Sequence, residues 1–231
     1  LLGSGINVDQ FLACQQGTSK QCRWDHDSDS GGALPPLPGA RFTGAKLALK
    51  GLRGEVSPLT AFCGLLPRGQ FDMAPFRRLV DDATGGADWV AHPATWIMAV
   101  DTTTGKRVPF GKGGAPQAHI RDAVCASYGV PFWCPPVSLG NRTYIDGGVA
   151  SPTSADLLVD SAVDEVIILA PMASRQSDKP RSPLTAIERR VRRYMTGIVD
   201  REVSKLEKAG KRVIRLEPGA KDLAAFGFNM M

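Results

Sequence analysis

The chain has 231 residues, of which 43% are hydrophobic, and it carries a formal net charge of +5 at pH 7. This length and composition allow one α/β domain with a substantial core. The sequence contains no apolar run of about 18 residues, so it predicts no transmembrane helix, and no secretory signal is visible at the amino end. We therefore expect a cytoplasmic protein, or one peripheral to a membrane.

The first third of the chain predicts helices separated by a long loop. Residues 6–16 have the spacing of a short helix, and residues 17–44, rich in Ser, Asp, Gly and Pro, predict a long exposed loop. Residues 45–52 suit either a strand or a helix. Residues 58–66 predict a helix, and a further helix is expected from an N-cap at Asp72 to the pair Gly85-Gly86.

The middle third predicts short strands and turns around one helix. The apolar run from Trp96 to Val100 indicates a buried strand, and Gly111 to Gly114 lack the spacing of a nucleotide-binding loop, which favours a plain turn. A helix is expected over residues 117–126, and the β-prone run from Thr143 to Ile145 predicts a second strand.

The last third continues the alternation of helices and strands. A helix is expected from residue 152 to 160, a strand of the central parallel type from Val166 to Leu169, and a final strand from Val213 to Leu216. Between these strands, Ser182 and Pro183 suit the N-cap and first position of the longest helix, and Gly210 suits its C-cap. The order predicts an α/β fold with a mainly parallel central sheet flanked by helices.

Half of the 28 Lys and Arg residues lie between Arg175 and Lys221. The positive electrostatic potential of these residues favours contact with an anionic membrane or an acidic partner. Nucleic acid is not an expected partner, because aromatic residues are not interleaved with the basic ones. The four arginines of the long helix are predicted to project away from its apolar side, as a solvated face or as a membrane-docking face. They are Arg189, Arg190, Arg192 and Arg193.

The cysteines and histidines show no metal-ligand spacing. Five cysteines are an odd number without a CxxC pattern, which favours free thiols over a disulfide framework. The three histidines, His26, His92 and His119, are interpreted as surface or packed residues. No metal site is therefore predicted.

The segment TYIDGGVA, from Thr143 to Ala150, contains the best candidate for a catalytic residue. A short strand ends in Asp146, and Gly147 and Gly148 follow at once, which is a common way to present a carboxylate at the rim of a sheet. The alternative is a solvated turn, because Asp-Gly is also an ordinary turn dipeptide.

Four separated segments resemble the patatin-like phospholipase family in their order along the chain. They are WIMAVDTTTG at residues 96–105, AVCASYGVPFWCPPVSLG at 123–140 followed by the DGG motif, VIILAP at 166–171 and RVIRLEPG at 212–219. The resemblance covers about residues 90–231. It implies one patatin-like domain over residues 1–231, incomplete at its amino end, with residues 20–86 either forming a cap or lid or simply packing on the sheet.

For function, the resemblance implies a serine acyl hydrolase that cleaves lipid esters through a Ser–Asp dyad, without a metal or organic cofactor. Asp146 is the position that matches the catalytic Asp, within the motif Asp146, Gly147 and Gly148. The expected partners are a lipid or acyl-ester substrate and the surface of an anionic membrane.

The nucleophile of that dyad is missing from the sequence. The family pattern GxSxG fits no serine, since Ser4 follows Leu2 and Ser19 precedes Gln21 at the two glycine positions. We expect that the chain starts downstream of the nucleophile, and that the complete protein supplies it. The alternative is an inactive lipid- or membrane-binding module that keeps the fold.

Overall fold

The computed structural model describes residues 7–16, 18–19, 36–92, 94–176 and 182–226. The chain divides into two compact units, Leu1–Ala150 and Ser151–Met231. The expectation of one domain over residues 1–231 stays a prediction. Most of the predicted 17–44 loop lies outside the described residues, and its described end, residues 36–44, contains one isolated β-bridge, between Phe42 and Pro67.

The first unit contains the predicted helices, with the ambiguous segment 45–52 resolved as a helix. Helices α1, α3, α4, α5 and α6 are Val8–Gln15, Ala45–Leu52, Pro58–Leu65, Ala74–Thr84 and Ile120–Ser127. The N-cap of α5 is Met73 rather than Asp72, although the Asp72 carboxylate accepts a hydrogen bond from the Ala74 amide at 2.9 Å. Gly85 ends α5 in the left-handed conformation, as predicted.

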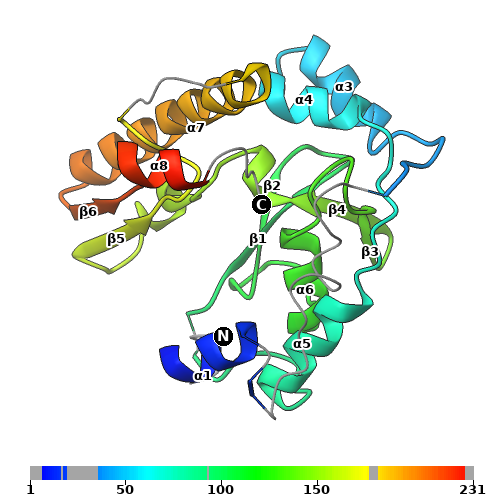
Figure 1. Ribbon diagram of the computed structural model, residues 1–231, viewed down its shortest axis with the longest axis horizontal. Coiled ribbons are helices and arrows are strands. Elements are labelled where there is room, and N and C mark those ends of the chain that lie inside the picture. Colours follow the sequence, from blue (N-terminus) through cyan, green and yellow to red (C-terminus); the bar gives the residue numbers. More distant parts are fainter. Residues whose placement is uncertain (1–6, 17, 20–35, 93, 177–181, 227–231) are drawn as a thin grey trace. The chain divides into compact units, whose positions relative to one another are not determined.

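A four-stranded sheet forms the centre of the first unit (Figure 1). Its strands are β1, β2, β3 and β4, at Ile97–Asp101, Arg107–Phe110, Val137–Leu139 and Arg142–Asp146, in the order β2-β1-β4-β3. Every neighbouring pair is antiparallel, so the prediction of a mainly parallel sheet is not confirmed in the described residues. Connection length explains the direction of the β3–β4 pair. Only Gly140 and Asn141 separate β3 from β4, and a link this short joins antiparallel strands.

The two faces of this sheet bury different side chains because residues alternate along a strand. Ala99 and Tyr144 belong to one apolar cluster, which also contains residues of α5 and α6. Their chain neighbours Val100 and Ile145 belong to a second cluster with Leu47 of α3 and Cys63 of α4. The sheet is thus covered by helices on both faces, as expected for an α/β fold.

The second unit contains a parallel strand pair joined by the longest helix. Strands β5 and β6, at Glu165–Leu169 and Arg212–Leu216, pair in parallel through the crossover helix α7, Pro183–Lys208. Ser182 caps α7 in a capping box with Thr185, and Pro183 follows it, as the sequence predicts. The segment predicted as a helix at 152–160 forms only a 3₁₀ turn, η3, at Ala155–Leu158. A short helix, α8, follows at Ala220–Phe226.

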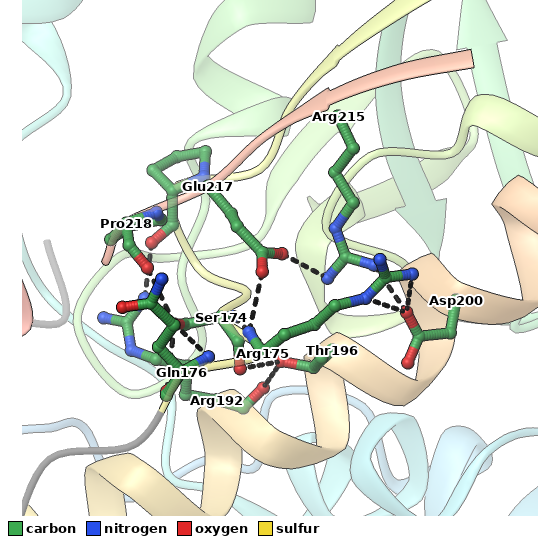
Figure 2. A network of polar contacts seen from close by, with 10 residues as sticks. Ser174, Arg175, Gln176, Arg192, Thr196, Asp200, Arg215, Glu217 and Pro218 are labelled. Atoms are coloured by element: carbon green, nitrogen blue, oxygen red, sulfur yellow. Dashed lines mark hydrogen bonds and ion pairs between the residues drawn. The ribbon is translucent and has the colours of Figure 1, made fainter. Parts of the chain in front are cut away.

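Polar side chains connect β6 and the segment after β5 to α7 (Figure 2). Arg215 of β6 pairs with Asp200 of α7 and with Glu217, each at 2.5 Å. The Ser174 amide donates to the Thr196 hydroxyl at 2.9 Å, and the Ser174 hydroxyl donates to the Pro218 carbonyl at 2.7 Å. These contacts fix the end of β6 against the middle of α7.

Two of the four arginines of α7 are not on its exposed face, contrary to prediction. Arg192 is only 4% exposed, its guanidinium donates to Glu188 at 2.8 Å, and it also bonds to the Pro171 carbonyl. Arg189 pairs with Glu188 and donates to the Leu223 carbonyl at 2.9 Å. Arg190 and Arg193 remain exposed, so the basic face is half the size predicted from the sequence.

No helix within the described ranges has the length and hydropathy needed to cross a bilayer.

Candidate functional site

Strand β4 fixes the position of Asp146 at its carboxyl end. Asp146 is the last residue of β4 and lies opposite Ala99 of β1 in the ladder. Its amide donates to the carbonyl of Gly129, just after α6, at 3.0 Å. The backbone of Asp146 is therefore held from two sides, which fixes where its side chain starts.

The DGG turn then folds back on the Asp146 carboxylate. The Gly148 amide donates to Asp146 Oδ1 at 2.7 Å, and residues Gly147–Val149 form a 3₁₀ turn, η2, for which Asp146 is the N-cap. A Cβ on Gly147 would lie 2.6 Å from the Met98 carbonyl oxygen, and a Cβ on Gly148 would lie 3.2 Å from Asp146 Oδ1. Gly147 is thus required by its close approach to the sheet backbone, whereas a side chain at Gly148 would press on the Asp146 carboxylate and shift it slightly.

Burial raises the pKa of Asp146 to about 6, and the hydrogen bond from Gly148 opposes this rise. A carboxylate with a pKa in this range can exchange a proton near neutral pH, which suits a general base better than a carboxylate of ordinary acidity. Strongly shifted carboxyl groups are frequent at functional sites.

The groups whose pKa is raised by the charge of Asp146 are themselves neutral near pH 7. Burial, with a smaller effect from the Asp146 charge, raises the pKa of Cys63 to about 11. Burial is also the main cause of the raised pKa of Tyr128 and of Cys134, the latter to about 12, and the Asp146 charge adds to both. All three groups are uncharged at neutral pH, so none of them offsets the cost of ionising Asp146.

Helix α4 contacts the DGG turn through one buried hydroxyl. Thr60 is 1% exposed, and its Oγ1 donates to the carbonyl of Val149 at 3.0 Å. The amide of Thr60 in turn donates to the hydroxyl of Ser57, the N-cap of α4, at 3.1 Å. The α3–α4 hairpin is therefore attached to the turn that carries Asp146, while its role as a cap stays a prediction.

The corner before β3 contains strain that the sequence did not reveal. Phe132 has a φ of 76°, which is rare for a residue with a large side chain. The corner is held by hydrogen bonds from the Cys134 amide to Val130 and from the Phe71 amide to Trp133, at 2.9 and 3.1 Å. The sequence indicated a Pro corner here, but neither this strain nor the role of Gly129 as acceptor for Asp146 could be read from residue types.

The other residues considered as candidates do not meet at Asp146. Ser4 lies outside the described residues. Gly111 to Gly114 form a turn, as predicted, in which the Lys112 ammonium lies 4.7 Å from the centre of the Trp96 ring. His119 pairs with Asp88 at 2.8 Å. Among the residues that the structure describes, no group of three or more His, Cys, Asp or Glu is arranged to hold a metal ion.

These features define an α/β protein with a half-buried carboxylate presented on a glycine turn. A family model, patatin-like phospholipase, matches residues 55–159, which include α4, the four-stranded sheet and the DGG turn. The resemblance predicted from the sequence is confirmed for this stretch, and it indicates lipid acyl hydrolase activity in general terms. The match starts earlier than the predicted 90–231 and does not include β5, α7 and β6. No curated protein matches the chain.

Proposed function

We propose that the complete protein hydrolyses ester bonds of lipids through a Ser–Asp dyad in which Asp146 is the general base. The observation that carries this proposal is the position of the Asp146 carboxylate together with its hydrogen bond and its raised pKa. It lies at the end of β4 within the matched stretch, it accepts a hydrogen bond from Gly148, and burial raises its pKa to about 6. A solvated turn Asp would not show such a shift.

In the proposed reaction, Asp146 takes the proton of a serine hydroxyl while the serine oxygen attacks the ester carbonyl. The alcohol of the ester leaves with that proton, and an acyl-enzyme remains. Asp146 then takes a proton from water as the water attacks the acyl group, the fatty acid leaves, and the serine recovers its proton. The serine is not among residues 1–231 in a GxSxG pattern, so the complete protein supplies it in this proposal.

The competing proposal is a lipid- or membrane-binding module without turnover. The two differ in what the reading frame upstream of Leu1 encodes. A Gly-rich loop and a GxSxG elbow in that frame support the hydrolase, whereas their absence supports the binding module.

The experiment compares the complete protein with its Asp146→Asn variant. Asn keeps the shape and an acceptor for the Gly148 amide but cannot take a proton, so we expect ester hydrolysis to fall about a hundredfold or more. The rate is measured on a p-nitrophenyl ester and on a phospholipid, with the circular dichroism spectrum as control for folding. Full activity of Asp146→Asn would remove Asp146 from the reaction.

A further inference from the structure

The α3–α4 hairpin is packed tightly on its inner side. A Cβ on Gly51 of α3 would lie 2.2 Å from the Cβ of Ala61 of α4, and a Cβ on Gly64 would lie 2.6 Å from the Gly44 carbonyl oxygen. Leu47 and Cys63 face the buried cluster on the sheet. The two helices therefore form one closely packed layer with a defined inner side.

The opposite side of the hairpin is apolar and exposed. On α3, Leu49 and Leu52 are 50% and 87% exposed, and on α4, Phe62 and Leu65 are 57% and 54% exposed. Positions three residues apart lie on one face of a helix, and in both helices this face is turned away from the buried Leu47 and Cys63. We call Leu49, Leu52, Phe62 and Leu65 the outer face of the hairpin.

The stretch of sequence that contains the outer face is mostly basic. Between Arg41 and Phe71 the sequence contains five basic residues and one acidic residue, Glu55. Glu55 is paired with Lys50 and, at 3.9 Å, with Arg53, and the side chains of Lys46 and Arg53 are exposed. The five basic residues are Arg41, Lys46, Lys50, Arg53 and Arg68. An apolar face bordered by Lys and Arg is the pattern of helices that lie in the surface of an anionic bilayer.

We propose that the outer face docks on the surface of an anionic lipid bilayer, with Leu49, Leu52, Phe62 and Leu65 entering the acyl boundary. Lys46 and Arg53 then contact the lipid phosphates. The inner side of the same helix α4 holds the DGG turn through Thr60 and Val149, so docking places the turn that carries Asp146 one helix layer away from the lipid. The proposal rests on the proposed function for its substrate but concerns a surface distinct from Asp146.

The test is sedimentation of the complete protein with vesicles of phosphatidylcholine and phosphatidylglycerol. We expect the double variant Leu52→Ser, Phe62→Ser to bind at least about tenfold more weakly, because two apolar side chains no longer leave water. The matched control is Ile167→Ser, Leu169→Ser on β5, where the side chains are 59% and 66% exposed. This control should bind within about twofold of the parent.

Three results would overturn the proposal. They are a parent protein that does not sediment with the vesicles, equal binding of both double variants, and a parent dimer in sedimentation velocity that dissociates only in the outer-face variant. The last result would assign the outer face to a second copy of the chain. Because binding is measured without turnover, an Asp146→Asn protein that binds the vesicles and keeps full activity would count against the proposed dyad only. A second outer-face pair, Leu49→Ser, Leu65→Ser, guards against a fold defect in the first.

Discussion

Asp101 and Asp146 illustrate how two carboxylates on neighbouring strands acquire opposite properties. Burial alone would raise the pKa of Asp101, but hydrogen bonds from Arg142, Thr103 and Thr104 outweigh it and lower the pKa. Asp146 has one amide donor, and burial raises its pKa to about 6. The DGG motif located Asp146 in the sequence. Its shifted pKa could not be predicted there, since it depends on groups brought together by folding.

The raised pKa of Asp146 predicts opposite effects of pH on activity and on stability. The base must be ionised, so hydrolysis by the complete protein should rise with pH through about 6 and then level off. The fold favours the neutral form, so this contribution to stability is full below about pH 4 and is lost as pH rises through about 6. Asp146→Asn should therefore match the parent near pH 4 and exceed it by about 1 to 3 kcal/mol at pH 8.

Urea unfolding of both proteins at the two pH values measures this difference. A stability gap that is the same at pH 4 and pH 8 would show that Asp146 is ionised without penalty in the fold. A rate that continues to rise well above pH 7 would assign the controlling ionisation to another group.

At the scale of elements, we expect the two neighbouring glycines of η2 to respond differently to substitution. Gly147→Ala brings a Cβ against the Met98 backbone, so it should cost about 2 kcal/mol or more of stability. Gly148→Ala brings its Cβ against the Asp146 carboxylate, so hydrolysis by the complete protein should fall more than stability does. Thermal midpoints and esterase rates of both variants test this. Gly197→Ala in α7, where a Cβ meets nothing within 4 Å, is the control and should stabilise slightly.

In helix α7, the features that depend on neighbouring residues were predicted from the sequence, and those that depend on distant residues were not. Its capping residues, Ser182 and Pro183, are local features, and the sequence predicted them correctly. The burial of Arg192 depends on the Pro171 carbonyl, which is distant along the chain and could not be anticipated. The spacing of Glu188 and Arg192, four residues apart, was the available signal of their ion pair.

At the scale of the whole chain, connection lengths predict strand direction better than family resemblance does. The two-residue link between β3 and β4 is visible in the sequence and specifies an antiparallel pair, yet the expected sheet was mainly parallel. The parallel pair β5–β6 has the long helical crossover that such pairing needs. The boundary between the two units, after Ala150, falls within a small-residue segment without any change in composition, so the sequence did not indicate it.

The alkylation rate of the three buried thiols of the first unit can report how often this unit opens. Cys63, Cys125 and Cys134 are free and buried, and burial raises each pKa to about 11 or 12. At pH 8 about one thiol in a thousand or fewer is the reactive thiolate, and none is easily reached by a reagent. With Cys14 and Cys22 replaced by Ser, alkylation should be slower by orders of magnitude than in urea, and Gly147→Ala should accelerate it. Alkylation at the rate of a free peptide thiol would contradict the buried positions. If alkylation is slow as expected, its rate measures how often this half of the chain opens.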